Sequence, residues 1–508
     1  VYDPAGANSL NSGRTPVGTR WSAPLTLRYL IDEEPASSVN LVVSELMIKP
    51  PKFGDGTFDK EAYEYVELMN IGTKSVSLAD VRLGVGIEFV FPDVSVGVGD
   101  RVLVVKNLAA FRQVYGEAAA AQVVGEYAGQ LGNGGDLFTV IAADGEIIQD
   151  VVYESTEGVG SLVNADQSDQ WLPGSSPLGT PGTQTLAETL EVQVNEVLSN
   201  SEPPALDAVE LLNNGAIAVD IGGWLLTDSL AWPRQFHIPE STMIEPGGFL
   251  VFTEAQFGSF ALSSAGDEVF LLATDAEGRF DGRMDSFVFG AAPIGVSYGL
   301  LVNSVGEKSV GVLETATLGG ANDVAHVGPL VFTELMVHPL PEDDEFIEIA
   351  NIGTESVDLT NGRVNGAGFT FVSGSLSPNQ TLILTSGDPA LFRQRHGVPA
   401  TTIVLGPLTA RLDNRGETLT LLLPNAAEPH LLIPSDQVDY QTSSPWPAVN
   451  GNGHSLERSR LDAFGSDPIV WLASAITGGT PGMHGGLTAP EPEPEPTPTG
   501  DDWKAAFF

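Results

Sequence analysis

The sequence predicts an all-β protein made of three tandem β-sandwich domains, and two observations carry this prediction. One stretch occurs three times, as EYVELMNIGTKSVSL at 64–78, DAVELLNNGAIAVDI at 207–221 and EFIEIANIGTESVDL at 345–359. Much of the remaining chain consists of alternating or β-branched runs of about 4–8 residues between turns. The 508 residues include 57 Gly and 35 Pro, which favour frequent turns. Many short strands between frequent turns are typical of β-sandwiches.

The three copies keep a constant register. Asn70, Asn213 and Asn351 occupy the same place in the repeated stretch, 143 and 138 residues apart. FRQVYG at Phe111 returns as FRQRHG at Phe392, and this offset of 281 residues equals the one between Asn70 and Asn351. A period of about 140 residues is far longer than the roughly 20–50 residues of solenoid repeats. We therefore expect each copy to have its own core.

The same order of elements is expected in each copy. An entry strand at 40–48, 191–199 and 328–336 precedes the Glu-bearing strand of the repeated stretch. An Asn-Gly type of turn, an aromatic-rich strand, a further strand and a hairpin opened by Gly and an acidic residue follow. About seven strands in this length predict two antiparallel sheets over one core. Short helices are expected only around 108–115 and 389–396.

The domain borders follow from where the repeats begin and end. Residues 1–36 do not match the repeat and are expected to be the tail of a preceding β module. PEPEPEP within 485–500 predicts a stiff Pro/Glu-rich linker, and 501–508 would open a further module. The chain begins with Val1 rather than Met, so we expect it to be part of a longer protein. The three sandwiches are expected at 40–184, 190–324 and 328–484.

Composition limits the classes of partner. The formal net charge is −43, with 23 basic and 66 acidic residues, whereas binding nucleic acid requires several Lys or Arg on the phosphates. Nucleic acid is therefore not expected as a partner. There is no Cys, which excludes disulfides, thiolate metal sites and a Cys nucleophile. No apolar run approaches the roughly 20 residues of a membrane span, so membrane insertion is not expected for these residues.

The entry strand with its Glu, the pattern E-[YF]-[VI]-E-[LI]-x-N-x-G and the following hairpin together resemble the lamin tail domain family. The resemblance covers about 41–183, 192–323 and 328–483, and it is weaker in the second copy, which lacks the closing Trp. The N-terminal piece resembles a fibronectin-III-associated strand module. The family implies an immunoglobulin-like sandwich without catalytic residues, within large exported bacterial proteins that also carry kinase, nuclease or other hydrolase modules.

Acidic residues recur in pairs and are the first candidates for chemistry. Two carboxylates in each domain could serve acid–base glycoside cleavage or hold a hard cation such as Ca²⁺. The structural alternative is that each Glu accepts backbone or hydroxyl hydrogen bonds at a strand edge or corner, and we favour it because catalytic pairs are seldom repeated three times. The pairs are Glu45 with Glu67, Glu196 with Glu210, and Glu334 with Glu348.

Three further groups of residues have structural and ligand-binding alternatives. Asn70, Asn213 and Asn351 are expected to support the turn that follows them rather than bind a ligand. Trp171 and Trp471 are expected to close the sandwich cores rather than stack on sugars. The cluster Glu342, Asp343, Asp344 and Glu345 lacks EF-hand spacing. We expect a solvated loop there, with at most a weak, millimolar-class Ca²⁺ site, and no other cofactor.

No motif in the sequence predicts an enzyme. GHSLE at 453–457 lacks the second Gly of a nucleophile elbow, so Ser455 and its counterpart Ser161 are expected to be strand positions. The sequence thus predicts a non-catalytic structural, adhesion or binding region of a large secreted or cell-surface bacterial protein. Its partners would be extracellular polysaccharide or a surface protein. The alternative is an accessory region, carbohydrate-binding or spacer, of an exported hydrolase, nuclease or spore-coat-type kinase.

Overall fold

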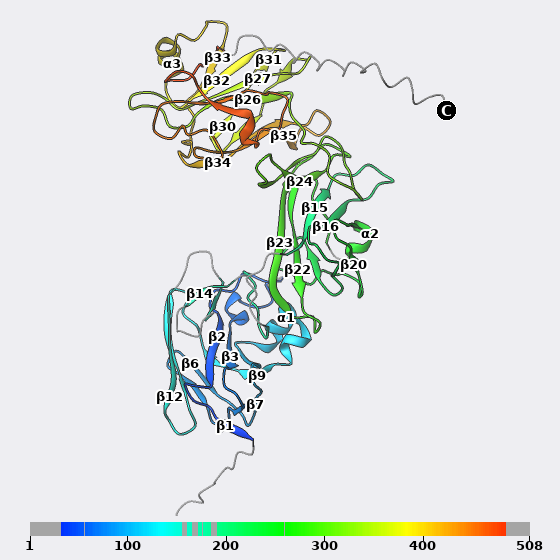
Figure 1. Cartoon of the computed structure of the whole chain (residues 1–508), viewed down its shortest axis with the longest axis vertical. Helices are drawn as coiled ribbons and strands as arrows, with labels where there is room; N and C mark the ends of the chain where they lie inside the picture. The colour runs from blue at the N-terminus through cyan, green and yellow to red at the C-terminus, as the bar shows by residue number, and fades with distance from the viewer. Residues whose placement is uncertain are drawn as a thin grey trace, which may run out of the picture. The chain divides into compact units, whose positions relative to one another are not determined.

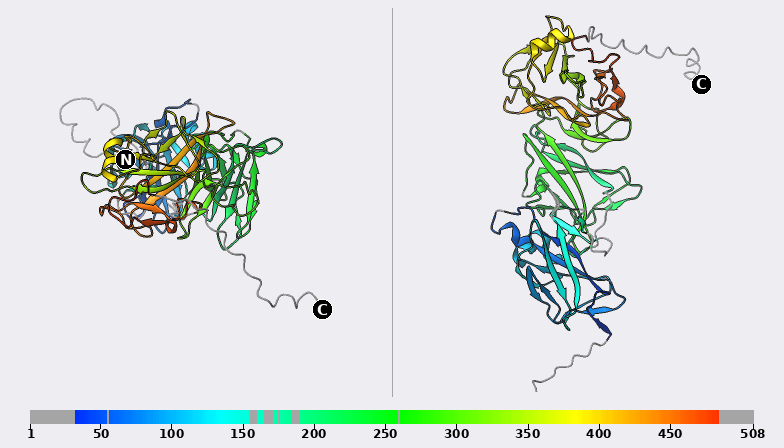
Figure 2. Two further views of the ribbon diagram at one scale, coloured as in Figure 1. Left: turned by 90° about the horizontal axis from the view of Figure 1, so that it is seen from above. Right: turned by 90° about the vertical axis from the view of Figure 1, so that its left-hand side faces the viewer.

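The computed structural model describes residues 32–54, 56–154, 160–164, 171–174, 176–183, 190–258 and 260–483. The chain divides into two compact units. The first comprises Val1–Glu188 with Thr274–Arg283, and the second comprises Thr189–Ala273 with Met284–Phe508. Figure 1 and Figure 2 show the strands and helices of both units, coloured along the chain. The predicted linker 485–500, the segment 501–508 and most of the segment 1–36 lie outside the described residues.

The first unit contains two larger sheets and a small one. The main sheet has the order β14-β13-β2-β3-β8-β9, and the opposite sheet has the order β10-β6-β5-β11-β12. The strands of the main sheet are β2 (Leu41–Met47), β3 (Tyr65–Asn70), β8 (Arg101–Val105), β9 (Val123–Glu126), β13 (Ser161–Val163) and β14 (Leu172–Pro173). Those of the opposite sheet are β5 (Arg82–Gly84), β6 (Ile87–Val90), β10 (Ala128–Gly129), β11 (Gly135–Ile141) and β12 (Ile147–Glu154).

The small sheet changes the predicted start of the first sandwich. It has the order β1-β4-β7, and β1 (Glu33–Pro35) pairs in parallel with β4 (Ser75–Ser77), which also pairs with β7 (Ser95–Val96). Ala36 joins the first hydrophobic core. Residues 33–36 were expected to end a preceding module, but they pack with the first sandwich because their backbone completes this sheet.

The second unit repeats the main sheet twice. Its first large sheet has the order β21-β16-β15-β24-β25 and faces β19-β18-β22-β23, with a side pair β17-β20. These strands are β15 (Val192–Leu198), β16 (Ala208–Asn213), β17 (Val219–Asp220), β18 (Leu225–Thr227), β19 (Phe236–His237), β20 (Met243–Ile244), β21 (Phe249–Thr253), β22 (Gly266–Thr274), β23 (Phe280–Gly290), β24 (Tyr298–Val302) and β25 (Lys308–Val312).

The last third of the described chain forms the other large sheet of the second unit. Its order is β33-β32-β27-β26-β36-β37, facing β30-β29-β34-β35, with a side pair β28-β31. The strands are β26 (Leu330–Met336), β27 (Phe346–Asn351), β28 (Val357–Asp358), β29 (Arg363–Asn365), β30 (Phe369–Thr370), β31 (Ser375–Leu376), β32 (Thr381–Thr385), β33 (Ile403–Leu405), β34 (Gly416–Pro424), β35 (Leu432–Gln441), β36 (Leu456–Arg458) and β37 (Trp471–Ala473).

Helices are short and lie between strands. α1 (Leu108–Ala120) connects β8 with β9 and begins at Asn107, whose side chain accepts from Ala110 N. α3 (Pro389–His396) connects β32 with β33, with Asp388 as N-cap and Gly397 in the left-handed conformation at its end. Both stand where the sequence predicts helices. The four-residue helix α2 (Glu254–Phe257) was not predicted, and η2 (Lys60–Tyr63) and η3 (Pro468–Val470) are single 3₁₀ turns.

Three separate hydrophobic clusters fill the space between facing sheets. Each collects the inward residues of an entry strand and of the strands opposite, for example Val43 and Phe138 in the first, Val194 and Phe287 in the second, and Phe332 in the third. The prediction of an all-β, immunoglobulin-like sandwich fold is confirmed. In the described part of the chain no helix is long and apolar enough to cross a membrane.

Candidate functional site

The recurring Glu residues lie side by side on the two central strands of each main sheet. The antiparallel pairing sets Glu45 opposite Glu67, and a β-bulge inserts one extra residue, Ser44, directly before this pair. The other copies have the same register shift, with Glu196 opposite Glu210 and Glu334 opposite Glu348. All six side chains are at most 2 % exposed. Like charges directly opposite on a sheet are destabilising, so such pairs need compensating donors.

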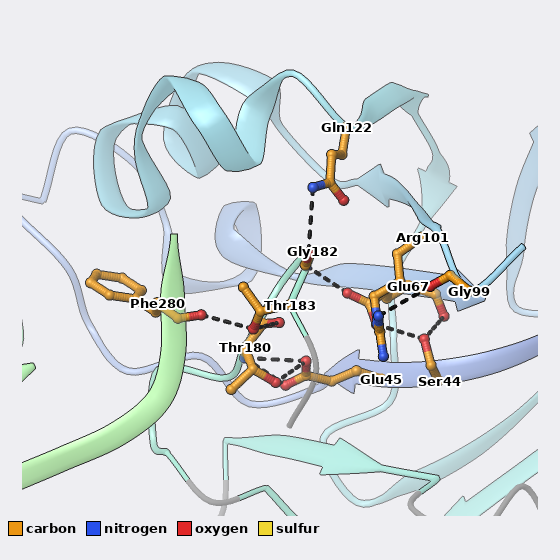
Figure 3. Close-up of polar contacts among 10 residues, drawn as sticks. All are labelled: Ser44, Glu45, Glu67, Gly99, Arg101, Gln122, Thr180, Gly182, Thr183 and Phe280. Atoms are coloured by element: carbon orange, nitrogen blue, oxygen red, sulfur yellow. Dashed lines mark hydrogen bonds and ion pairs between the residues drawn. The ribbon is translucent and has the colours of Figure 1, made fainter. Parts of the chain in front are cut away.

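In the first copy these donors come from the segment that closes the sandwich. Glu45 accepts hydrogen bonds from Thr180 N at 2.9 Å and from Thr180 Oγ1 at 2.8 Å. Glu67 accepts from Gly182 N and from Ser44 Oγ, both at 2.6 Å, and Arg101 Nε lies 3.1 Å from its Oε1. Figure 3 shows both carboxylates facing this segment. The segment Thr274–Arg283, which includes the start of β23 and belongs to the same compact unit, also contacts the closing segment, because Thr183 Oγ1 donates to Phe280 O at 2.8 Å.

The second copy repeats the arrangement. Glu196 accepts from Thr317 N at 2.7 Å and from Thr317 Oγ1 at 2.8 Å, and Ser297 Oγ adds a third donor at 2.6 Å. Glu210 accepts from Gly319 N and from Asn195 Nδ2. Asn195 is the bulged residue here, as Ser44 is in the first copy.

The third copy has the same donors at the same places. Glu334 accepts from Thr480 N at 2.7 Å and from Ser455 Oγ at 2.5 Å. Glu348 accepts from Gly482 N at 2.5 Å and from the bulged Thr333 through its Oγ1 at 2.9 Å. We call each set of two Glu with its closing Thr and Gly a glutamate clasp. The clasps are Glu45, Glu67, Thr180 and Gly182; Glu196, Glu210, Thr317 and Gly319; and Glu334, Glu348, Thr480 and Gly482.

Burial makes these carboxyl groups harder to ionise. Desolvation raises the pKa of Glu334 to about 7, although the bonds from Ser455 and Thr480 act in the opposite direction. In the first clasp, burial raises the pKa of both Glu45 and Glu67, and the charge of Glu45 raises that of Glu67 further. Burial also raises the pKa of Glu210. Since burial also raises the pKa of Glu67 to about 8, the first and the third clasp each hold a carboxyl group that is close to protonation at neutral pH.

A second set of residues completes each bulge. At each bulge, the backbone N–H of the residue before the bulged one donates a hydrogen bond to a side chain. This side chain lies on the last strand of the opposite sheet. Gln149 Oε1 accepts from Val43 N, Asp285 Oδ2 from Val194 N, and Asp436 Oδ2 from Phe332 N. These acceptors were not predicted from the sequence. Gln149 and Asp436 are 287 rather than 281 residues apart, because the hairpin of the third copy is longer, so they do not fall in the common register.

The three Asn residues make identical contacts. Asn70 Nδ2 donates to Lys74 O and Val96 O at 2.8 Å each, and its Oδ1 accepts from Gly72 N. Asn213 contacts Ile217 O, Ile244 O and Gly215 N in the same way. Asn351 contacts Glu355 O, Leu376 O and Gly353 N. Each side chain thus ties the turn after the Glu-bearing strand to a neighbouring strand.

The two Trp residues differ in burial. Trp471 is 2 % exposed, its Nε1 donates to Gly465 O at 2.8 Å, and it lies against Trp446 and the Arg458 guanidinium. Trp171 is half-buried and packs against the first core. The closing segments that carry them also carry the Thr and Gly of the first and third clasps.

Two carboxylates of the acidic cluster lie beside basic side chains of their own copy. Asp343 lies 2.9 Å from His396 Nε2 and 3.4 Å from Arg395 Nη1, and Asp344 lies 2.8 Å from the same Arg nitrogen. Glu345 accepts from Leu412 N at 3.1 Å, whereas Glu342 is exposed with φ of 78°. Within the described ranges, no three His, Asp or Glu residues are grouped so that they could hold a metal ion.

The residues of the weak elbow motif do not form a nucleophile with its base. Ser455 donates to Glu334, and the neighbouring His454 Nδ1 instead contacts Ser474 O at 2.7 Å. Ser161 is buried at the start of β13. The hydroxyl of Ser455 therefore serves as a hydrogen-bond donor to the third Glu pair and is not paired with a base.

A comparison with protein-family models gives one match. The model of the Lamin Tail Domain matches residues 186–289 and 324–441. These segments include the second and third Glu pairs. The match does not include residues 40–184, where the sequence resemblance was expected to be stronger than in the second copy. No curated protein and no solved structure matches the chain.

Proposed function

Since residues 186–289 and 324–441 are lamin tail domains, a non-catalytic immunoglobulin-like fold, we propose that the whole chain is a non-catalytic structural region of a large exported protein. In this proposal the first sandwich is a third copy of the same domain, and the array carries or spaces other modules at the cell surface. The repeated register of Glu45 and Glu67, with the same bulge and the same closing Thr and Gly, supports the assignment of the first copy.

The observation that carries the proposal is the use of the recurring polar residues. In all three clasps the carboxylates accept hydrogen bonds from the segment that closes the sandwich. A general acid or base must be able to reach a substrate, whereas these six side chains are buried. The Glu residues that a catalytic interpretation would require are thus the ones that connect the closing segment to the main sheet.

The accessory carbohydrate-binding alternative has less support. Sugar-binding faces present aromatic rings to solvent, but Trp446 and Trp471 are 3 % and 2 % exposed, and Trp171 is half-buried. Among the aromatic side chains of the described residues, Trp232 alone is exposed, at 42 %. A single ring offers a small stacking surface.

The test separates a structural Glu from a catalytic one. Glu348→Gln in the full chain keeps the size of the side chain but replaces an acceptor oxygen of the third clasp by an NH₂ group. We expect a lower melting temperature, by several degrees, while the exposed control Glu117→Gln leaves it unchanged. Unchanged melting together with loss of a measurable hydrolase activity would contradict the proposal.

Binding and location are tested separately. Sedimentation of the purified chain with insoluble cellulose, chitin and peptidoglycan should leave the chain in solution, and Trp232→Ala should not change this. Saturable sedimentation that Trp232→Ala abolishes would instead support the accessory alternative. Antibodies against the chain should label intact, unpermeabilised cells if the protein is exported, and labelling only after permeabilisation would contradict export.

A further inference from the structure

The second copy lacks a strand that the other two copies have. Its strand β21 ends the main sheet, whereas the corresponding strands β8 and β32 each pair in parallel with one more strand, β9 or β33. The correspondence is fixed by the pairing with the Glu-bearing strands. Glu67 pairs with Leu103, Glu210 with Val251, and Glu348 with Ile383. Val251 therefore corresponds to Leu103 and Ile383, each of which is paired with a further strand in its own copy.

The cause is a shorter connection. In the first copy the connection between Val105 and Gly135 contains α1 and β9. In the third copy the connection between Thr385 and Gly416 contains α3 and β33. In the second copy the next hairpin begins at Gly266, soon after β21 ends at Thr253. Within the described residues, the only helix or strand in this interval is the short helix α2, which directly follows β21 and is labelled in Figure 1.

The outer edge of β21 presents backbone groups to a partner. Glu254 N donates to Asp207 O, and Asn213 N donates to Gly248 O, which fixes the hydrogen-bonded positions of the β16–β21 ladder. Because these positions alternate along antiparallel strands, the N–H and C=O of Val251 point away from β16. In the first copy the corresponding Leu103 N donates to Gln122 O at 3.0 Å.

The side chains of β21 are also more exposed than those of the corresponding strands. Phe249, Leu250 and Val251 are half-buried. By contrast, residues 102–105 of β8 are at most 4 % exposed and 382–385 of β32 are fully buried. Edge strands of natural proteins commonly carry Lys, Pro or a bulge that blocks further pairing. The strand FLVFT has none of these.

We propose that the outer edge of β21 binds an extended segment of a partner protein, which lies parallel to β21 as β9 and β33 lie beside β8 and β32. Such strand addition gains affinity from backbone hydrogen bonds and selectivity from alternate side chains. The sister strand β33 indicates the chemistry of the segment, because Ile403 and Leu405 pack on the third core. The partner segment would thus carry aliphatic residues at alternate positions. This inference does not depend on the structural role proposed above.

The probe is a capped, fluorescent peptide with the sequence of residues 400–406, ATTIVLG, titrated with the full chain in an anisotropy assay. We expect saturable binding. Val251→Pro removes the outward N–H, and Pro is tolerated on sheet edges, so it should fold and bind at least about tenfold more weakly. The matched control Val251→Thr keeps the N–H and should bind like the unaltered chain.

A control on the peptide avoids any question of folding. In the parallel pairing of Ile383 with Val404, the N–H of Leu405 faces the sheet and that of Val404 faces away. N-methylation at the Leu405 position should abolish binding, and N-methylation at the Val404 position should not.

Three results would overturn the inference. The first is the absence of saturable binding up to about 1 mM peptide, the limit of weak recognition. The second is equal binding by the two methylated peptides, and the third is a wild-type chain that dimerises in sedimentation experiments while Val251→Pro stays monomeric. The edge would then pair with a second copy of the chain rather than with a partner.

Discussion

At the scale of the residue, the recurring polar side chains are explained by the cost of burial. A buried polar group without a partner costs about 1–3 kcal/mol, and more if it is charged. A carboxylate has two acceptor oxygens and no donor, so it can receive a Thr N–H and a Thr hydroxyl together, as Glu45 does. The amide of Asn70 both donates and accepts, and its three partners require both functions.

The first prediction concerns the Asn of the turn. Asn351→Ala should lower the free energy of unfolding by about 2–4 kcal/mol, because Glu355 O, Leu376 O and Gly353 N lose their partners in a buried site. Urea unfolding followed by circular dichroism measures this. The control Asn452→Ala also removes two hydrogen bonds, to Ala448 O and from His454 N, but at an exposed position. A similar loss in both variants would contradict the role of burial.

The second prediction concerns pH. Burial raises the pKa of Glu334 from 4.5 to about 7, so between these values the folded state binds more protons than the unfolded state. The contribution of Glu334 to stability is therefore fully present below about pH 4.5 and is lost as the pH rises to about 7. Glu45 and Glu67, whose pKa values are also raised, act in the same direction. Melting temperatures measured across this range should decrease with pH.

Two controls separate this effect from general repulsion in a chain of net charge −43. At 1 M NaCl the screening length is about 3 Å, so surface repulsion is suppressed while the buried effect persists. Glu334→Gln should flatten the pH dependence, whereas Gln at the exposed Glu355 should not. A dependence that disappears entirely in high salt would show that the clasps do not contribute.

Residues that recur in a fixed register could be predicted from the sequence, whereas residues with a shared role but no fixed register could not. Glu67 and Asn70 stand in one uninterrupted stretch, so each copy reveals them. Gln149, Asp285 and Asp436 share a role, but they differ in residue type and follow hairpins of unequal length. No sequence pattern connects these three residues. What they share is a hydrogen bond from the residue that precedes a bulge, and this contact is visible only in the structure.

At the scale of the element, each clasp fastens the closing segment to the centre of the main sheet. The segment turns at a glycine in the left-handed region, Gly179 in the first copy and Gly479 in the third. A Cβ at Gly479 would collide with Glu334 Oε1, and one at Gly179 with Tyr65 Oη. The neighbouring Gly478 also has a positive φ, but a Cβ there would meet no atom closer than 3.9 Å.

This pair gives the third prediction. Gly478→Ala and Gly479→Ala share the strain of a positive φ, but only Gly479→Ala should displace the Glu334 carboxylate. We expect Gly479→Ala to destabilise the chain by at least about 2 kcal/mol more than Gly478→Ala, since it also breaks buried hydrogen bonds. Denaturant unfolding of the two variants measures the difference. Equal losses would mean that the clasp adds little to stability.

Elements were predictable where the local pattern decides them. The entry strands, the Glu-bearing strands and helices α1 and α3 stand within a few residues of their predicted positions. The parallel pairing of β9 and β33 was not predictable, because it depends on the helix that returns the chain to the same edge. The uncovered edge of β21 likewise follows from a shorter connection, whose effect appears only when the three sheets are compared.

At the scale of the whole molecule, the three hydrophobic clusters share no residue. Each has its own clasp and its own turn Asn, so a change in one clasp acts first on one core. Large multi-core chains commonly depart from two-state unfolding. The repeat period had predicted separate cores, since about 140 residues are enough for an independent domain.

The fourth prediction follows from this separation. Calorimetry of the full chain should show more than one unfolding transition. Glu67→Gln should lower the temperature of one transition and Asn351→Ala that of a different one, because these residues belong to different cores. The double variant should show both shifts, each equal to that in the single variant, as expected for two sites that share no partners. If either substitution moved every transition together, the cores would unfold as one cooperative body, and the repeated domains would be units of sequence but not of stability.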